Sequence, residues 1–337
     1  MLWLLDHRLD NKLRRSADGI DKGYVVGVDL GGTNLRLALA DGHGEVLARW
    51  STRTVGIKAP DEIVKLISAG VDGLAAQTGL GRHDLLAVGV GAPGVTNAET
   101  GVVIATSYLM GWRDVPLRAL LESALGLPVS VDNDVNVAAL GESRTGLARD
   151  IRDFVFLAIG SGVGAGIVLN GRIFQGAGWT AGEIGYMLLP GLPEEAIERG
   201  RPGALEGFVG GEGIRARWKS LWDETKTTLP MDITATEIFD HASAGETLAD
   251  AVLYDSARTL AYAIYNMALI LNCPLFVLGG GVGMHPALCA RTRKILEARG
   301  TRAVPKLVIS ALGEEAQLIG AIRLAMDTAI AHGAVRL

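Results

Sequence analysis

Residues 24–41 read YVVGVDLGGTNLRLALAD, which is two apolar runs joined by a Gly-Gly turn. Apolar runs on either side of such a dipeptide are typical of a β-hairpin. A related stretch at residues 154–170, FVFLAIGSGVGAGIVLN, again places glycines between two apolar runs. This weak internal similarity, with one hairpin in each half of the chain, predicts two related α/β domains.

Helices and further strands are expected after each hairpin. Helices are predicted at about residues 60–78, 115–125, 134–144, 204–220, 246–272, 286–298 and 314–330, and strands at LLAVGV, PVSVDN, LFVLG and KLVISAL. In the second hairpin we expect SGVGAG to form the turn and IVLNG the returning strand. Each domain is then a mixed sheet flanked by helices, with the ligand site in the cleft between the domains.

The charge balance excludes a general nucleic-acid binder. The chain has 337 residues, with 32 Lys and Arg against 37 Asp and Glu, which gives a net charge of −5. Domains that bind nucleic acids usually carry a basic surface instead. Apolar residues make up 49% of the chain, which is enough for a large core.

The cysteine count and the first residues of the chain indicate in which compartment of the cell the protein is expected. Two cysteines, Cys273 and Cys289, cannot form a disulfide framework. The apolar run at residues 1–5 is too short for a signal sequence or a membrane span, because charged residues follow it. We therefore expect a cytoplasmic protein with no membrane partner, in which the polar residues 1–23 form a flexible arm.

The glycine-rich turn of the first hairpin is a candidate phosphate-binding loop. Gly31 and Gly32 leave backbone N–H groups open to a phosphate, and the side chains of Thr33 and Asn34 can add contacts. Asp29, at the end of the first strand, can hold Mg²⁺ through water. The alternative interpretation is a plain hairpin turn.

Two other glycine clusters follow apolar strands. One lies in the second hairpin, at residues 160–166, and the other is the Gly-Gly-Gly run at residues 279–281. In α/β sheets nucleotides bind at the carboxyl ends of strands, where this run is expected. Two glycine turns, one per domain, support a shared phosphate site more strongly than either does alone.

Several familiar motifs are absent. GVGAPG at residues 89–94 fits the pattern G-x-G-x-x-G, but no helix opens after Pro93, so the dinucleotide-binding context is missing. The sequence has no Gly-Lys pair and therefore no Walker A loop. Its six histidines show no paired spacing with cysteine, so no structural zinc is expected.

Carboxylates in three segments are candidates for chemistry or sugar binding. Asp132, Asn133 and Asp134 join a strand end to a helix start, where they can cap the helix. Alternatively, a carboxylate there accepts the proton of a substrate hydroxyl while the Asn binds the same substrate. Glu183 and Glu206 lie in glycine-rich apolar surroundings, as solvated loop residues or as ligands of sugar hydroxyls.

In this order, the segments resemble the ROK family of repressors and sugar kinases, within the actin-like ATPase superfamily. The resemblance runs from about residue 24 to 329 and rests on VGVDLGGTNLRLALAD, GVGAPG, VDNDVNVAALGE, IGSGVGAGIVLNGRIFQGAGWTAGEIG, LFVLGGGV and ALGEEAQLIGA. It implies two actin-like domains that close over Mg²⁺-ATP and a hexose. The small domain would comprise residues 24–133 and 314–337, and the large domain residues 134–313.

The resemblance also implies roles for single residues. Asp134 would be the general base that takes the proton of the attacking hydroxyl. The ATP-binding residues would be Asp29, Gly31, Gly32, Thr33 and Asn34 in the first loop, Gly160, Ser161, Gly162 and Gly164 in the second, and Gly280 and Gly281 beside the nucleoside. The sugar would contact Asn133, Glu183, Tyr186, Glu206 and Gly94.

Three positions depart from the family pattern. Tyr186 stands where family members usually have a histidine. The stretch ERGRPGALEG has no cysteine where the family usually binds zinc, so no zinc is expected here. Tyr108 stands where a sugar-binding Asn often precedes Gly-Trp. These changes lie outside the residues expected to bind ATP. They leave the identity of the sugar open.

The implied activity is ATP-dependent phosphorylation of a hexose hydroxyl by a homodimer, with glucose as the expected substrate and glucose 6-phosphate as the product. The alternatives are a kinase for another hexose or for an N-acetylated amino sugar, and a sugar-binding regulator without catalysis. We expect no repressor, because the 23 residues before Tyr24 are too few for a winged-helix domain. The sequence leaves open which hydroxyl is attacked and which phosphoryl donor is preferred.

Overall fold

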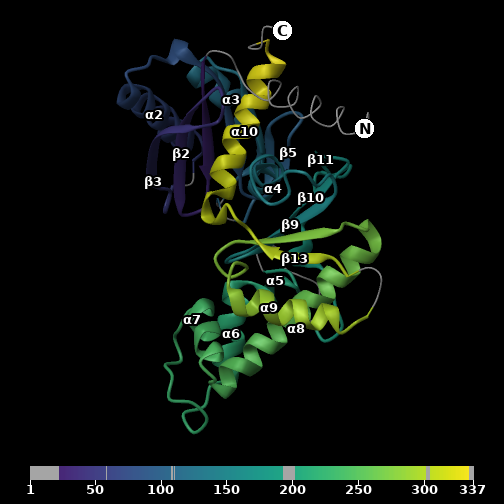
Figure 1. The fold of residues 1–337 in the computed structure, drawn as a ribbon. Helices are drawn as coiled ribbons and strands as arrows, with labels where there is room; N and C mark the ends of the chain where they lie inside the picture. Colours follow the sequence, from purple (N-terminus) through teal and green to yellow (C-terminus); the bar gives the residue numbers. More distant parts are fainter. Residues whose placement is uncertain are drawn as a thin grey trace, which may run out of the picture. The chain divides into compact units, whose positions relative to one another are not determined.

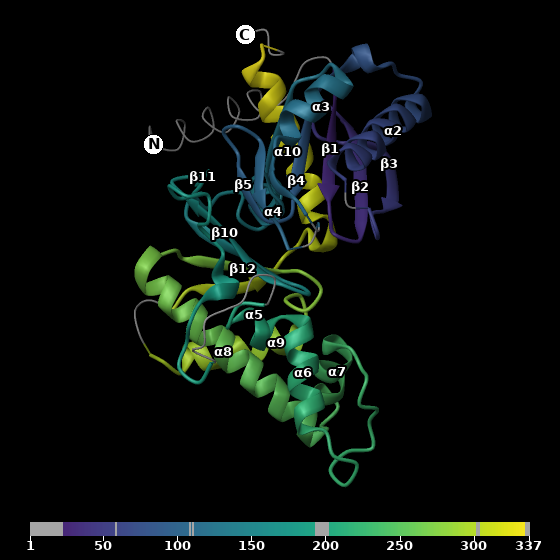
Figure 2. The same cartoon turned by 180° about the vertical axis from the view of Figure 1, so that it is seen from behind.

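The computed structural model describes residues 23–57, 59–107, 109, 111–192, 202–300 and 304–333. The expectations for the arm before Gly23 and for Tyr108 lie outside these residues. The described residues up to Val137, together with those from Gln317 onward, form one compact unit, and Ala138–Ala316 form a second. Figure 1 shows both units, and Figure 2 shows them from behind.

A mixed five-stranded sheet forms the centre of the first unit. Its strand order is β3-β2-β1-β4-β8, in which β1, β2 and β3 pair antiparallel while β4 and β8 continue parallel to β1. The predicted hairpin is confirmed, because β1 and β2 pair over their length. The bounds are Tyr24–Leu30 for β1, Asn34–Asp41 for β2, Val46–Arg53 for β3, Leu85–Ala92 for β4 and Val129–Asn133 for β8.

Helices cover both faces of this sheet (Figure 1). On one face α2 and α3 pack over a core that includes Leu37, Ile67 and Leu121. On the other face α10 lies so close that a Cβ on Gly89 would be 2.2 Å from the carbonyl oxygen of Ala321. The helices of this region are α2 (Pro60–Thr78), η1 (Arg82–Asp84), α3 (Leu117–Leu125), α4 (Asp134–Arg144) and α10 (Ala316–Ala331).

A small antiparallel sheet of three strands follows β4 and was not predicted. Its strands are β5 (Val95–Asn97), β6 (Val102–Ala105) and β7 (Arg113–Val115). Strands this short show too little alternation to be distinguished from loops. Because Val115 belongs to strand β7, the helix predicted from Val115 begins only at Leu117. Arg118 secures the connecting loop by donating to the carbonyl oxygens of Ala98 and Glu99, at 2.7 Å each.

The second unit contains another mixed five-stranded sheet, in the order β11-β10-β9-β12-β13. The turn predicted as SGVGAG is shorter than expected, because β10 begins at Val163 and pairs with β9 from there, Val163 with Ile159 and Gly164 with Ala158. Glycines can take part in a β-sheet because their backbone N–H and C=O groups form the same hydrogen bonds as those of other residues. The bounds are Phe154–Ile159 for β9, Val163–Leu169 for β10, Arg172–Ile173 for β11, Leu275–Gly279 for β12 and Lys306–Ile309 for β13.

The helices of the second unit contribute to a large core that includes the buried side chain of Trp218. The helix predicted at residues 204–220 is two helices, because Gly210 has an extended backbone, with φ −70° and ψ 156°, that interrupts it. The bounds are η2 (Ile184–Tyr186), α5 (Glu206–Val209), α6 (Gly211–Leu221), α7 (Ala235–Ser243), α8 (Thr247–Leu271), α9 (Pro286–Glu297) and η3 (Gly313–Glu315). None of the helices in the described ranges has the length and hydropathy needed to cross a membrane.

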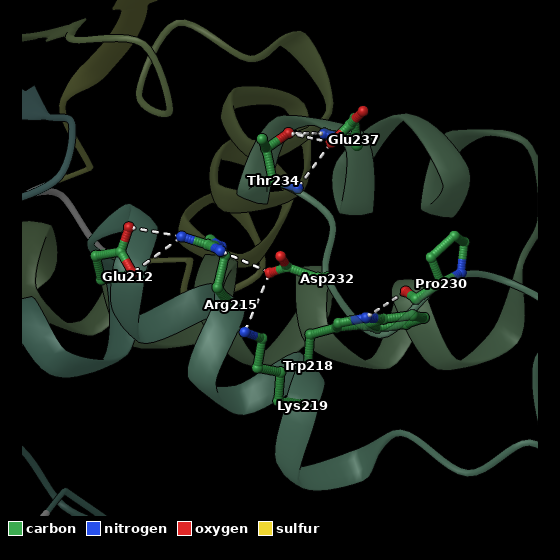
Figure 3. A network of polar contacts seen from close by, with 8 residues as sticks. All are labelled: Glu212, Arg215, Trp218, Lys219, Pro230, Asp232, Thr234 and Glu237. Atoms are coloured by element: carbon green, nitrogen blue, oxygen red, sulfur yellow. Dashed lines mark hydrogen bonds and ion pairs between the residues drawn. The ribbon is translucent and has the colours of Figure 1, made fainter.

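Helix α7 was also not predicted, although its start carries a recognisable signal. Thr234 and Glu237 form a capping box, in which each side chain bonds the backbone N–H of the other residue (Figure 3). The segment before α7 is tied to α6. Asp232 accepts from Arg215 at 2.8 Å, and the indole N–H of Trp218 donates to the carbonyl oxygen of Pro230 at 3.2 Å.

Candidate active site

The turn between β1 and β2 closes tightly and exposes two polar side chains. The N–H of Gly31 donates to the carbonyl oxygen of Asn34 at 2.8 Å. Thr54, just after β3, braces the turn, because its hydroxyl donates to the carbonyl oxygen of Gly31 at 3.0 Å and its N–H to that of Thr33 at 2.9 Å. Thr33 and Asn34 are exposed at the tip. The turn is thus a rigid support for side chains that can contact a ligand.

Asp29, at the end of β1, forms an ion pair with Arg36 of β2. The guanidinium donates from Nε and Nη2 to Oδ2 of Asp29, at 2.8 and 2.7 Å. The pair follows from strand register, because these two residues lie opposite each other and their side chains share one face of the sheet. Arg36 was not singled out in the sequence, although counting outward from the turn would have found it.

Asn133 is the N-terminal cap of α4. Its Oδ1 accepts the N–H groups of Val135 and Asn136 at 2.9 and 3.1 Å, which confirms the capping interpretation for this residue. Its Nδ2 donates to the carbonyl oxygen of Gly94 at 2.9 Å. Gly94 has φ +95°, and a Cβ there would be 2.3 Å from the carbonyl oxygen of Ala105, so only glycine fits.

Asp134 is the first residue of α4 and lies near the end of the central strands. Strand register places Gly91 of β4 between Asp29 and Asp132. A Cβ on Gly91 would be 3.4 Å from the Cα of Asp134. Asp29 is therefore the strand neighbour of Gly91, and the backbone of Asp134 lies close to the same glycine. A carboxylate in the first turn of a helix is also favoured by the helix dipole.

Mg²⁺ prefers carboxylate oxygens and water as ligands. Asp29, at the end of β1, is a carboxylate whose Oδ2 also pairs with Arg36, and it fits this ion through bound water. Within the described ranges, no group of three or more His, Cys, Asp or Glu side chains is arranged to hold a metal by itself. Part of the segment where the family usually binds zinc, residues 193–201, lies outside those ranges.

The turn between β9 and β10 is built differently from the first turn. The N–H of Gly160 donates to the carbonyl oxygen of Gly162 at 2.9 Å, and Ser161 is exposed. Two neighbours hold its ends. The N–H of Gly211 donates to the carbonyl oxygen of Gly160 at 2.8 Å, and the N–H of Val163 donates to a carboxylate oxygen of Glu206 at 2.9 Å.

The glycines after β12 lie against the end of β9. Val282 and Gly283 donate their N–H groups to the carbonyl oxygen of Ile159 at 3.0 and 2.9 Å. Gly280 has φ +77°, and a Cβ there would be 2.5 Å from the same oxygen, whereas Gly281 faces open space. The second and third glycine clusters therefore meet at the carboxyl ends of two adjacent strands.

Glu183, Tyr186 and Glu206 form a separate group in the second unit. Burial raises the pKa of Glu183, and the charge of Glu206 raises it further. Burial likewise raises the pKa of Glu206, which the Val163 N–H bond partly offsets. Tyr186 is half exposed, and burial together with both carboxylates raises its pKa. The two carboxylates are thus poorly solvated, which suits them to bind hydroxyl donors.

The predicted residues fall into two sets. The first unit brings together Asp29, Gly31, Gly32, Thr33, Asn34, Gly94, Asn133 and Asp134 at one end of its sheet. The second unit brings together Gly160, Ser161, Gly162, Gly164, Glu183, Tyr186, Glu206, Gly280 and Gly281. Sequence reasoning missed the supports Arg36, Thr54 and Gly211, which act through register or backbone bonds and carry no motif.

The model of the ROK family matches residues 25–328. The chain belongs to the ROK family. A glucokinase from Halalkalibacterium halodurans is 34% identical over 313 residues, covering 88% of this chain and 93% of that protein. Among solved structures, the ROK hexokinase from Thermus thermophilus has a TM-score of 0.74 at 29% identity, and covers 92% of this chain and 100% of the other.

A second solved ROK structure carries ligands. It is a glucokinase from Streptomyces griseus in complex with glucose and AMPPNP, with a TM-score of 0.76 at 27% identity, and it covers 90% of this chain and 100% of the other. The actin-like α/β fold expected from the motifs is therefore confirmed by the two mixed sheets and by these ROK relatives.

Proposed function

We propose that this protein is an ATP-dependent hexose kinase that converts glucose to glucose 6-phosphate. The observation that carries the proposal is the position of Asp134, which is held at the start of α4 by the Asn133 cap and lies beside Gly91. The ROK family match and the 34% identical glucokinase support the same activity.

In the proposed reaction, Asp134 accepts the proton of the attacking sugar hydroxyl. The hydroxyl oxygen forms a bond to the γ-phosphorus of ATP, the bond from that phosphorus to the β–γ bridging oxygen breaks, and ADP leaves. Phosphoryl transfer depends mainly on positioning and on charge stabilisation. When bound, Mg²⁺ would neutralise charge on the phosphates, with Asp29 as the carboxylate that can hold it.

The ATP-binding residues are proposed on the two glycine turns. Gly31, Gly32, Thr33 and Asn34 are proposed to contact phosphate on the first unit, and Gly160, Ser161 and Gly162 on the second. Gly164, also predicted for the second loop, lies in β10 and pairs with Ala158 instead of forming part of the turn. The N–H groups of Gly31 and Gly160 already donate within their own turns, so the proposal rests on the other backbone N–H groups of the turns and on the exposed side chains of Thr33, Asn34 and Ser161. Gly281, which faces open space after β12, can lie beside the nucleoside together with Gly280.

The sugar ligands are proposed as Asn133, Gly94, Glu183, Glu206 and Tyr186. Asn133 has fewer polar groups left for the sugar than the motif suggests. Its Oδ1 is used by the helix cap and one N–H by Gly94, which leaves the second N–H of Nδ2 to donate to a sugar oxygen. Glu183 and Glu206 accept from sugar hydroxyls. Tyr186 replaces the usual histidine and is proposed to influence which sugar is chosen.

The dimer is proposed from the family, the cytoplasmic location from the cysteine count and the first residues, and the absence of zinc from the missing cysteines. We propose a homodimer that works in the cytoplasm and needs no zinc. Light scattering of the purified protein tests the dimer, and elemental analysis tests the absence of zinc.

The experiment that tests the activity is ADP release in a coupled assay with Mg²⁺-ATP. The panel contains glucose, mannose, fructose, allose, N-acetylglucosamine, N-acetylmannosamine and a blank without sugar. We expect release that depends on sugar and is fastest with glucose. A faster rate with an N-acetylated sugar would change the substrate but keep the kinase. Sugar-dependent thermal stabilisation without ADP release would favour a binding regulator and contradict the proposal.

A further inference from the structure

Glu206 contacts two parts of the second unit that the proposed function assigns to different substrates. It belongs to the sugar-side group with Glu183 and Tyr186. Its Oε2 also accepts the N–H of Val163, the residue that ends the phosphate-binding turn, at 2.9 Å. We infer that Glu206 couples sugar binding to the order of the turn at residues 160–163. This inference rests on the proposed function and adds a positioning role to Glu206.

The first residues of the consecutive helices α5 and α6 are attached to the two ends of that turn. One attachment is the carboxylate of Glu206, the first residue of α5. The other is Gly211, the first residue of α6, which donates its N–H to the carbonyl oxygen of Gly160 at 2.8 Å. Between them, Gly210 packs so closely that a Cβ there would be 2.9 Å from the carbonyl oxygen of Ser161. A joint movement of α5 and α6 would therefore move the turn at both ends.

The segment that carries the other sugar-side residues packs on the same strand. The N–H of Ala165 in β10 donates to the carbonyl oxygen of Gly182 at 2.8 Å. A Cβ on Gly185 would be 2.8 Å from the carbonyl oxygen of Val163 and 3.3 Å from the Cβ of Glu206. The turn, β10, α5 and the segment 182–186 therefore form one closely packed block.

Sugar binding and the order of the turn are coupled because the sugar and Val163 bind the same carboxylate, that of Glu206. An ionised carboxylate has about four acceptor positions, so the bond to Val163 leaves capacity for a sugar hydroxyl. The sugar and the N–H of Val163 each restrict the movement of the Glu206 side chain. The partner that binds second therefore costs less conformational entropy. Because coupling between two sites is reciprocal, sugar should order the turn, and an ordered turn should bind sugar more tightly.

Amide hydrogen exchange tests the inference on the unmodified protein. Glucose is added without nucleotide, and exchange is followed in the peptide that covers residues 159–166. We expect glucose to slow exchange there at least about fivefold, at the lower end of usual coupling strengths. Glucose that binds without slowing exchange in this peptide would overturn the inference.

A variant removes the link without altering a proposed sugar ligand. In Val163→Pro the N–H that reaches Glu206 is lost, and proline is tolerated at the first residue of a strand. We expect glucose to bind this variant at least about fivefold more weakly in calorimetry, by the same coupling. Gly207→Ala is the control, because this position on α5 faces open space and should keep the parent affinity. Parent-like affinity in folded Val163→Pro contradicts the inference.

The outcomes separate the two proposals. No ADP release with any sugar of the panel contradicts the kinase itself. If the parent protein releases ADP with glucose but glucose does not slow amide exchange in residues 159–166, only the coupling is contradicted. If Val163→Pro does not fold, as judged by circular dichroism, the exchange measurement on the parent protein decides alone.

Discussion

Arg36 contacts a single oxygen of Asp29 twice, through a hydrogen bond from Nε at 2.8 Å and an ion-pair contact from Nη2 at 2.7 Å, two residues before the turn between β1 and β2. The side chain of Asp29 is only 14% exposed, so water screens this pair less than it screens a surface ion pair. The contact holds the end of β1 and the carboxylate that is proposed to face Mg²⁺-ATP. Arg36 therefore supports the end of β1 and the turn that follows it.

We expect Arg36→Met to lower the free energy of unfolding by about 1–3 kcal/mol, because hydrogen bonds to charged groups contribute about this much. Urea denaturation measures the change. The control is Arg53→Met at the exposed end of β3, which should stay within about 0.5 kcal/mol of the parent. Equal stability of the two variants would show that the Asp29 contact contributes nothing.

Asp134→Asn should lower kcat at least about 100-fold, since a general base contributes about 10²- to 10⁴-fold. Binding of AMPPNP and glucose should stay near parent values, because Asn keeps the shape of the side chain. Calorimetry and the coupled assay measure the two effects. Asp61→Asn is a matched control, as Asp61 also lies in the first turn of a helix, α2, and is exposed. Turnover at the parent rate in Asp134→Asn would exclude Asp134 as the base.

Glu183→Gln should raise Tm by a few degrees at pH 7. Burial and the charge of Glu206 raise the pKa of Glu183 in the folded state, so folding is opposed once this carboxylate is ionised. The stability that protonation confers is complete below the ordinary pKa and is lost as the pH rises through the raised value. The difference in Tm between variant and parent should therefore shrink at pH 4, which a pH series of melting curves measures. A variant less stable than the parent at pH 7 would contradict this.

Gly280→Ala should destabilise the second unit by about 1–3 kcal/mol, because a side chain there would be strained. Its φ is +77°, and the added Cβ would be 2.5 Å from the carbonyl oxygen of Ile159. Gly281→Ala is the matched comparison, since its Cβ would face open space and stability should change little. Chemical denaturation compares the two. Similar losses at both positions would refute the account given for Gly280.

Cys273 should resist alkylation in the folded protein. Burial, followed by the charge of Asp153, raises the pKa of this thiol to about 11. Only the thiolate reacts, so at pH 8 about one thiol in a thousand is reactive. Mass spectrometry after iodoacetamide should show Cys273 unmodified in buffer and modified in urea. Rapid labelling in buffer would mean that the region around the thiol opens readily.

Much of the fold was predictable from local pattern. The hairpin at residues 24–41, the strands at residues 85–92 and 154–159, and helix α2 all carry apolar spacing or end signals strong enough to identify. The three short strands β5, β6 and β7 were missed because three or four residues show no alternation. The break at Gly210 was missed because the next residue, Gly211, bonds to Gly160, which lies 51 positions earlier in the chain.

The sequence by itself determined the types of residue available for chemistry and the strands that carry them. Glycine turns after apolar runs and Asn-Asp before a helix need only local order to be recognised. Tertiary structure alone decided what those residues touch. It makes Asn133 a helix cap, pairs Arg36 with Asp29, and gives Glu206 the N–H of Val163. These contacts depend on strand register and on packing between distant segments, which no local pattern records.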